Sequence, residues 1–471
     1  MLKRAFGIAG LLLLVITLVS ACIKPEQENA ATYLAAAEVQ PYQNPLRIPI
    51  ALTFSKPCSY QIEYWKKDDP GVEGTTRVFE SAGGQNSATV MFLYPNTVYE
   101  YRVKILAGGN SHYSETATFK TGPLPVGVPE YNVDTNYAHE AIPGYMLQFQ
   151  ASEPGYVTFS DTDGKVVWFE KVELAVRQVT YDPATRLLSM NLGFKYGETN
   201  QQFYRLAEKI VVMNLEGNRS VDIKTAPDNV EFAHHEIKRM PDGNMAMLCN
   251  VPKVFDLTPI GGEPNTTLYG DGIKIVTPDF KTVLWEWDCF RELDPLRDEY
   301  LDAVTNKTDL IHANSIGWDD EGNLYYTINH LSELWKIDRK TGEVLYRVGE
   351  HGNMTMDEAF YASGLHAAEP LSPNKVLCLD NGTEDGVSRA LIYEVNPGAK
   401  TARASLCVPF PAEFCTRNRG NVSLIRDGSM LFYGSTTGYA CVFTDLKGNV
   451  LKVIRRTGVS YRSYYFEKIE Y

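Results

Sequence analysis

The stretch His235-Glu-Ile-Lys-Arg-Met-Pro-Asp-Gly243-Asn-Met-Ala-Met247 has the pattern of a strand, a tight turn and a second strand. Its turn glycine lies eight residues after the histidine, and the same layout returns at 314–322, 366–374, 420–428 and, more faintly, 177–185. A second hairpin follows each unit, for example at 333–346. Four strands joined by tight turns within about 40 to 60 residues are typical of one β-propeller blade.

The number of these units predicts the size of the propeller. They begin near positions 143, 177, 235, 312, 366 and 420, which indicates six blades. The last strand of the chain, Tyr461–Glu467, has no hairpin partner of its own. We expect it to complete the first blade, because a closed ring leaves no sheet edge open.

A separate domain precedes the propeller. Short alternating strands occupy residues 32–122, and Leu93–Val103 resembles the tyrosine corner of fibronectin type III domains. The Pro- and Gly-rich run Gly122–Gly127 then marks a boundary. The sequence therefore predicts an all-β protein, with an Ig/fibronectin-III-like β-sandwich at 32–122 followed by a six-bladed β-propeller at 128–471.

The first residues have the features of a lipoprotein leader. Two basic residues precede the apolar run Ala9–Val19, and small residues lead up to Cys22. The run is shorter than the ~20 residues that a membrane span needs. We expect a signal peptide at 1–21, a lipid on Cys22 and a tether at 22–31. The protein would then be exported and lipid-anchored in the cell envelope, on its periplasmic face or at the cell surface.

Charge and cysteine content limit the partners and the covalent framework. The chain has a net charge of −13, and loss of Lys3 and Arg4 with the leader leaves 43 basic against 58 acidic residues, or −15. Nucleic acid is therefore not an expected partner. The seven cysteines beyond Cys22 include no zinc-binding spacing, and we interpret most of them as small buried hydrophobes with room for one disulfide.

The first strand of each blade lines the central channel, so equivalent positions at the starts of these strands converge. His312 lies two residues before Asn314 and faces the same way on an extended strand. Several imidazoles and guanidinium groups are a costly way to fill a core, so we expect a functional site there. The positions that converge are Arg177, His235, Asn314, His366 and Gly420, with Tyr461 and Arg462 at the head of the closing strand.

The motifs around these positions resemble, in order and approximate spacing, those of the bacterial aryl-sulfate sulfotransferases, over about residues 140 to 471. The motifs are Phe232–Asn244, Asp309–Ser315, Gly364–His366, Leu379–Gly382, Ser388–Ala390 and Arg419–Asn421. The resemblance implies an enzyme that uses no nucleotide sulfate donor, no metal and no other cofactor. A histidine would take the sulfuryl group from an aryl sulfate donor and pass it to a phenolic acceptor, by ping-pong transfer through a sulfohistidine.

The resemblance also implies roles for single residues. His366 is the expected nucleophile, and His235 and His312 are expected to support catalysis. The expected substrate-binding residues are Arg177, Asn314, Asn329, Arg419, Tyr461 and Arg462.

One segment departs from the family pattern. Asn329-His330 stands where the family commonly has Arg-His, so one sulfate-binding charge is missing, and Arg177 or Arg419 would have to compensate. We expect His234 to point away from His235, as neighbours on a strand do. Arg389 is open between a structural ion pair and a site role.

Two other classes of function remain open. The chain could be a non-catalytic surface lipoprotein that binds glycan or protein through the propeller. It could also be a metal-dependent propeller hydrolase or lyase, although the aligned channel positions offer no Asp or Glu as ligand. A homodimer is left open as well.

Overall fold

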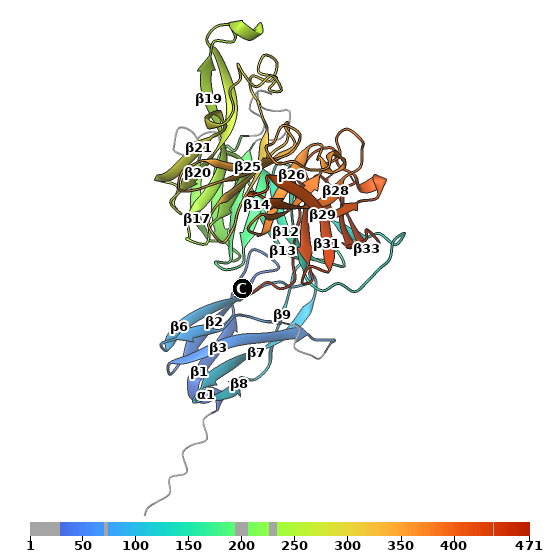
Figure 1. Cartoon of the computed structure of the whole chain (residues 1–471). Coiled ribbons are helices and arrows are strands. Elements are labelled where there is room, and N and C mark those ends of the chain that lie inside the picture. The colour runs from blue at the N-terminus through green and yellow to red at the C-terminus, as the bar shows by residue number, and fades with distance from the viewer. Residues whose placement is uncertain (1–28, 70–73, 194–205, 226–232, 437) are drawn as a thin grey trace, which may run out of the picture.

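The computed structural model describes residues 29–69, 74–193, 206–225, 233–436 and 438–471. The only α-helix in these ranges is α1 (Ala30–Tyr33), and everything else regular is strand or short 3₁₀ turn. A β-sandwich and a larger ring of sheets form the molecule (Figure 1). The predicted all-β class is confirmed. No helix in the described ranges is long and apolar enough to cross a membrane.

The N-terminal body is a two-sheet sandwich. One sheet is β1 (Leu34–Val39), β2 (Ile48–Phe54) and β6 (Gly84–Val90); the other contains β3 (Cys58–Lys66), β4 (Gly74–Thr75), β5 (Phe79–Ser81), β7 (Val98–Ala107), β8 (Asn110–Tyr113) and β9 (Ala117–Lys120). Alternate residues of β2 are buried, as expected for a sheet with one face on a core. The Tyr99 hydroxyl accepts a hydrogen bond from the Tyr94 N–H (2.8 Å), which confirms the tyrosine corner.

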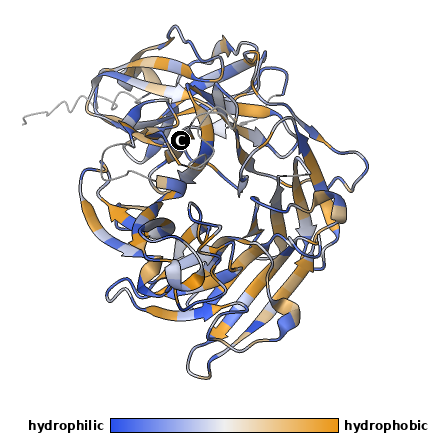
Figure 2. Cartoon of the chain, turned by 90° about the horizontal axis from the view of Figure 1, so that it is seen from above, coloured by the Kyte–Doolittle hydropathy of each residue, from blue (hydrophilic) through white to orange (hydrophobic). Residues whose placement is uncertain are grey.

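Six sheets form the propeller, five of them four-stranded and one five-stranded, and Figure 2 shows them arranged around one axis. Blade 1 is β11 (Tyr145–Gln150), β12 (Gly155–Asp161), β13 (Val166–Val172) and the C-terminal β34 (Tyr464–Phe466); blade 2 is β14 (Ala175–Asp182), β15 (Leu187–Gly193), β16 (Lys209–Asn214) and β17 (Arg219–Lys224); blade 3 is β18 (Ala233–Arg239), β19 (Met245–Phe255), β20 (Thr266–Val276) and β21 (Val283–Asp288).

The remaining three blades follow the same order along the chain. Blade 4 is β22 (Ala313–Trp318), β23 (Leu324–Ile328), β24 (Glu333–Ile337) and β25 (Val344–Val348); blade 5 is β26 (Leu365–Ser372), β27 (Lys375–Asp380), β28 (Arg389–Asn396) and β29 (Thr401–Pro409); blade 6 is β30 (Asn421–Ile425), β31 (Met430–Ser435), β32 (Ala440–Asp445) and β33 (Val450–Arg456), with β10 (Tyr131–Val133) added at its outer edge.

The C-terminal strand closes the ring. Tyr465 of β34 pairs with Met146 of β11, so the last strand of the chain is the innermost strand of the first blade. The prediction that this segment completes blade 1 is confirmed. Closure joins the two ends of the propeller through backbone hydrogen bonds and removes two open sheet edges.

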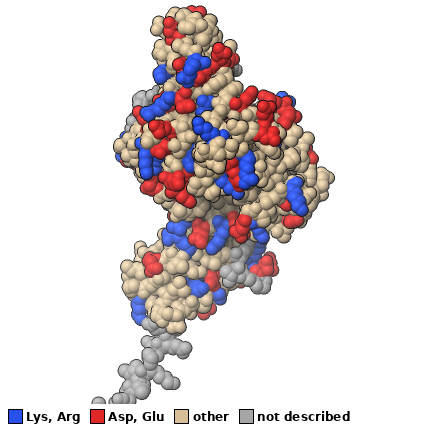
Figure 3. All heavy atoms as spheres, viewed as in Figure 1, with Lys and Arg blue, Asp and Glu red and all other residues tan. Residues whose placement is uncertain are grey.

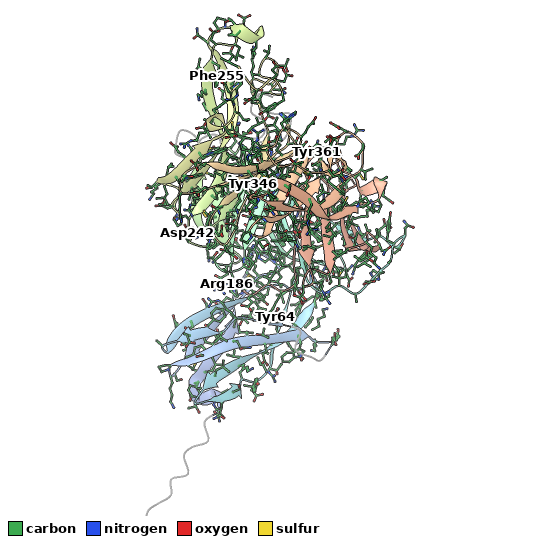
Figure 4. All side chains as sticks on the ribbon, in the orientation of Figure 1. Tyr64, Arg186, Asp242, Phe255, Tyr346 and Tyr361 are labelled. Carbon is green, nitrogen blue, oxygen red and sulfur yellow. The ribbon has the colours of Figure 1, made fainter. Side chains whose placement is uncertain are left out.

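The sandwich packs against blades 1 and 2 of the propeller. Phe92 of the sandwich lies 5.5 Å from Phe159 and 5.1 Å from Tyr471 between ring centroids. The guanidinium of Arg47 is 2.6 Å from the Glu170 carboxylate. Tyr64, labelled at the junction in Figure 4, contacts the Tyr471 hydroxyl. These contacts bury apolar surface between the two bodies and hold them together.

The two faces of the propeller differ. The hairpin of β19 and β20 projects from the side away from the sandwich, with Phe255 near its tip, whereas the turns that contain Arg186 and Asp242 lie toward the sandwich (Figures 1 and 4). His234 pairs with Leu248, at the end of β18 that leads toward this hairpin. The starts of the inner strands, where the candidate residues lie, are therefore on the face away from the sandwich.

The described cysteines form no disulfide, and the surface shows mixed charge. Of Cys58, Cys249, Cys289, Cys378, Cys407, Cys415 and Cys441, only Cys407 is exposed and five are buried. Most of these thiols act as small hydrophobes, as predicted. Acidic and basic side chains are interspersed over the face seen in Figure 3. Cys22 lies outside the described residues.

Candidate active site

Each of four inner strands carries a β-bulge near its start, and the candidate residues sit at these bulges. At the same level the backbone of His235, His312 and Ala367 has positive φ values of 48°, 54° and 52°. Positive φ is strained for residues with a side chain, and such strain gathers at functional sites. The shifts in register fall between Val176 and Gln178, His234 and Ile237, Ala313 and Ser315, and His366 and Glu369.

One side of the channel mouth joins blades 5, 6 and 1. The backbone N–H of Arg419 donates a hydrogen bond to Nε2 of His366 (3.3 Å). The next residue, Gly420, donates its N–H to the carbonyl oxygen of Tyr461 (3.0 Å). The side chain of Asn381 donates to the carbonyl oxygen of Arg419 (2.9 Å) and fixes the Arg419 backbone beside the imidazole.

The other side completes a ring of contacts through blades 3 and 4. The His235 ring lies 5.5 Å from the Tyr461 ring and 5.0 Å from the His312 ring. The carbonyl oxygen of His312 accepts a hydrogen bond from the Asn329 N–H (3.1 Å). The side-chain amide of Asn329 lies 3.2 Å from Nδ1 of His366. The structure thus brings His235, His312, Asn329, His366, Arg419 and Tyr461 into one continuous site.

His366 is a buried, neutral imidazole with a defined tautomer. His366 is 2% exposed, and its Nδ1 lies 3.2 Å from the carbonyl oxygen of Gly364. The Arg419 N–H donates to Nε2, so Nε2 carries the lone pair and Nδ1 carries the proton, which faces the Gly364 carbonyl. Burial, followed by the positive charge of Arg462, lowers the pKa of His366 to about 3. The ring is therefore unprotonated at Nε2 near neutral pH.

A glycine allows the Gly364 carbonyl to reach this position. Its φ of +80° is in the left-handed region, and a Cβ atom would lie 2.6 Å from the Thr383 side chain. Any larger residue would have both backbone strain and a steric clash. The acceptor for Nδ1–H therefore depends on the absence of a side chain at position 364.

His312 belongs to a polar group that has metal-binding residue types. Its Nδ1 is 2.6 Å from Oδ2 of Asp309, and its ring stacks on His330 with centroids 5.2 Å apart and an interplanar angle of 27°. Ligand atoms of the three residues lie within 4.8 Å of one another. The short contact with the Asp309 carboxylate, however, already takes up Nδ1, one of the two ring nitrogens of His312. The arrangement suits a carboxylate that orients His312 better than a metal site.

His234 does not point away from His235, so that expectation is wrong. Their Nδ1 atoms are 2.7 Å apart. The bulge between His234 and Ile237 breaks the strict alternation of the strand, which allows adjacent imidazoles to meet. Behind this pair, Nε2 of His234 is 3.0 Å from Oδ1 of the buried Asp271.

Arg462 is held by a carboxylate that sequence reasoning missed. Its guanidinium is ion-paired with Glu236 and donates to the carbonyl oxygen of Asn314 (2.7 Å). Burial alone would raise the pKa of Glu236. The positive charges of Arg462 and Lys238 hold this pKa below its ordinary value. Glu236 directly follows the two histidines in the chain, so its position in the motif was the available signal. The aligned positions predicted a channel without Asp or Glu. The structure shows that Glu236 lies in it.

Two other candidate residues, Asn314 and Arg177, lie in surroundings that indicate a structural role. The Asn314 side chain is buried, donates to the Leu365 carbonyl oxygen (2.8 Å) and accepts from Thr327 (2.9 Å), so it links blades 4 and 5. Arg177 is 8% exposed and passes over Gly193, where a Cβ would lie 2.8 Å from its Nε.

The question left open for Arg389 has a structural answer. Its Nε donates to Asp380 (2.7 Å), and its terminal nitrogens donate to the carbonyl oxygens of Ala359 (3.0 Å) and Tyr361 (2.7 Å). Both Asp380 and Arg389 belong to blade 5, so the pair lies within one blade. Arg389 therefore anchors a loop to its blade, and among the residues that the structure describes it has no contact that indicates a site role.

The site is the channel of a six-bladed propeller, where His235 and His312 lie near the buried, neutral imidazole of His366. The sequence matches the arylsulfotransferase (ASST) family over residues 132–461 and the fibronectin type III domain over residues 49–120. The chain belongs to the arylsulfotransferase family and is an aryl-sulfate sulfotransferase by this membership. The predicted family and the predicted N-terminal fold are both confirmed.

Comparisons with solved structures return distant similarities. A protein of unknown function from Bacteroides caccae is 12% identical with a TM-score of 0.43, over 69% of this chain and 100% of that chain. A catalytically inactive virginiamycin B lyase from Staphylococcus aureus is 12% identical with a TM-score of 0.32, over 70% of this chain and 100% of that chain. No curated protein is significantly similar to the sequence.

Proposed function

We propose that the enzyme moves a sulfuryl group from an aryl sulfate to a phenolic acceptor in two steps, through a sulfohistidine at His366. The observation that supports this most directly is the state of the His366 ring. It is buried and neutral, with Nδ1–H facing the Gly364 carbonyl and the Nε2 lone pair at the Arg419 amide. A neutral imidazole with a fixed tautomer is a competent nucleophile at neutral pH.

In the first step the Nε2 lone pair of His366 attacks sulfur. The bond between sulfur and the aryl oxygen breaks, and its electron pair leaves with the phenolate. Nδ1 keeps its proton, so the ring becomes a cationic N-sulfoimidazolium, and the Gly364 carbonyl (3.2 Å from Nδ1) stabilises the new positive charge.

The surrounding groups suit the charge of the sulfuryl oxygens. The transition state is expected to be loose, so catalysis depends on position and on donors for three oxygens. The Arg419 N–H already points at Nε2, and His235 and His312 lie on the adjoining side of the ring of contacts. When sulfur takes up the Nε2 lone pair, the Arg419 N–H lies beside a sulfuryl oxygen.

In the second step the acceptor oxygen attacks sulfur and the bond to Nε2 breaks. The electron pair returns to the imidazole, and the acceptor loses its proton to a base in the site. The neutral ring that results is the state that burial favours. The low pKa of His366 therefore keeps the ring neutral for attack and favours its departure from sulfur.

A burst experiment tests this proposal. The detergent-solubilised full-length protein is mixed with 4-nitrophenyl sulfate alone, and we expect a burst of nitrophenol no larger than the enzyme concentration, then slow hydrolysis. Added phenol should restore steady turnover, and quenched enzyme should carry a sulfuryl group on the peptide with Gly364–His366. His366→Ala should remove both burst and label. Transfer by His366→Ala at a near wild-type rate would overturn the proposal.

A further inference from the structure

A buried polar chain runs behind His235 into the body of blade 3. Nε2 of His234 is 3.0 Å from Oδ1 of Asp271, and Nδ1 of His234 is 2.7 Å from Nδ1 of His235. Asp271 and His234 are fully buried, and His235 is 9% exposed. The chain therefore leads from an inaccessible carboxylate to an imidazole in the channel site.

The carboxylate at the inner end is held in place by donors from two elements. The side-chain amide of Asn250 donates to Oδ1 of Asp271 (2.7 Å), and the backbone N–H of Ala313 donates to Oδ2 (2.7 Å). Ala313 directly follows His312, so the same carboxylate also ties blade 3 to the start of the inner strand of blade 4. An acceptor-only, ionised carboxylate fits these contacts.

The order of the chain assigns the protons. An acceptor-only carboxylate 3.0 Å from Nε2 favours the proton of neutral His234 on that nitrogen, which leaves the lone pair on Nδ1. The 2.7 Å contact between the two Nδ1 atoms then requires His235 to donate from its own Nδ1. The lone pair of His235 is thereby on Nε2, and any proton exchanged with a bound ligand passes through that atom.

The position of His235 gives this lone pair a use. Its ring lies 5.0 Å from His312 and 5.5 Å from Tyr461, both of which line the same site as His366. Burying two imidazoles and a carboxylate costs more free energy than filling the same space with apolar side chains. The bulged backbone of His235, with φ of +48°, adds to this cost.

From this geometry we infer that Asp271 and His234 are positioning residues that make His235 the acid–base group of the transfer reaction. This inference rests on the proposed function. When the acceptor attacks sulfohistidine, its O–H proton moves to Nε2 of His235 as the bond between sulfur and oxygen forms and the bond between sulfur and His366 breaks. In the other half-reaction the protonated His235 returns that proton to the leaving phenolate.

The chain supports both protonation states of His235. When Nε2 of His235 gains a proton, the His235 ring becomes cationic. The Nδ1–H of His235 then donates a stronger hydrogen bond to Nδ1 of His234. The negative charge of Asp271, 3.0 Å beyond His234, stabilises that cation through the shared imidazole. General acid–base groups held in this way contribute about 10²- to 10⁴-fold to a rate.

The dependence on leaving group separates this role from a structural one. A nitrophenolate leaves without help, whereas an unsubstituted phenolate is a poor leaving group that gains from protonation. We expect Asp271→Asn to slow the half-reaction with phenyl sulfate by about 100-fold and the burst with 4-nitrophenyl sulfate by less than about 5-fold. His235→Gln should show the same selectivity, and the double variant should lose no more than either single one.

A matched control and a second variant guard against misfolding. Asp319→Asn replaces another buried carboxylate, which is paired with Lys336 (2.8 Å) away from the site. It should slow the half-reactions of both aryl sulfates equally or not at all. His234→Gln tests the same chain if Asp271→Asn does not fold. Equal losses for both aryl sulfates in the Asp271 and His234 variants would overturn the inference. Failure of the proposed function would differ, because the wild-type enzyme would then carry no sulfuryl label at His366.

Discussion

Arg462 and Glu236 form an ion pair inside the propeller channel, although the two residues lie 226 positions apart in the sequence. Neither residue is more than 2% exposed. Arg462 comes from the closing strand segment and Glu236 from the inner strand of blade 3. The pair therefore joins the C-terminal end of the chain to the middle of the ring. The positive charge of Arg462 also lowers the pKa of His366, as the second-largest cause after burial.

Breaking this pair should destabilise the protein. Arg462→Met leaves the Glu236 carboxylate buried with Lys238 (3.0 Å) as its remaining cation, and we expect a loss of about 3 kcal/mol in the free energy of unfolding. Adding Glu236→Gln should recover part of that loss, because no uncompensated charge is then buried. Urea unfolding of the two single variants, the double variant and the wild type measures the coupling. A coupling below about 0.5 kcal/mol would show that the two charges do not stabilise each other.

The low pKa of His366 makes the folding stability depend on pH. The unfolded chain binds a proton at the ordinary histidine pKa near 6.5, whereas the folded protein binds it only near pH 3. Stability from the neutral ring is thus complete above pH 6.5 and is lost as the pH falls toward 3. The stability difference between wild type and His366→Gln should shift by about 2.5 kcal/mol against the wild type from pH 7 to pH 4.5. A difference that stays constant would mean that His366 titrates normally.

The contact between the sandwich and the propeller should be important for stability. Phe92 is 6% exposed and packs against Tyr145, Phe159 and Tyr471 of the propeller. Phe92→Ala should lower the free energy of unfolding by about 3 kcal/mol, since a large buried ring leaves a cavity. Val126→Ala, at a fully exposed position between the two bodies, is the control and should have no effect. Thermal unfolding of both variants decides; an unchanged melting temperature for Phe92→Ala would contradict the packing.

The blade repeat explains why much of the site was predictable. His235, Asn314 and His366 occupy equivalent places in successive blades, with His312 two residues before Asn314, and a propeller brings equivalent places together whatever their separation in the chain. Asp271 was not predictable in this way, because it lies on the third strand of blade 3, outside the inner-strand register. The contact between His234 and His235 depends on a bulge, and periodicity alone does not reveal where a strand loses its alternation.

Anchoring through Cys22 is proposed on the leader sequence alone. Cys22→Ser should move the protein from the detergent phase to the aqueous phase in phase partitioning, since one thiol carries the lipid. Because the candidate site lies at the starts of the inner strands of the propeller, whereas the leader precedes the sandwich in the chain, we expect the released protein to keep its full sulfotransferase activity. Cys407→Ser, which changes an exposed cysteine of the propeller, should leave partitioning unchanged. Detergent-phase partitioning of Cys22→Ser would rule out the lipid on this residue.

Asn329 should control affinity for the sulfate donor. It stands where the family commonly has arginine, and its side-chain amide lies 3.2 Å from Nδ1 of His366. Asn329→Arg adds a long cationic side chain to the same channel site, and a charge-assisted contact with a sulfate oxygen contributes about 1.5–3 kcal/mol. We expect the KM for the aryl sulfate to fall by about 10-fold or more, while the KM for the uncharged phenol changes little.

The control for this charge is a second arginine placed close by but outside the contact. Asn418→Arg adds the same charge at an exposed position next to Arg419 and should leave both KM values within about 2-fold, because exposed charges are screened by water and salt. Steady-state kinetics with each substrate varied in turn gives the two KM values. If Asn329→Arg lowers both KM values equally, or if Asn418→Arg has the same effect on the donor, the residue at position 329 acts through the general field of the protein and does not bind the sulfuryl group.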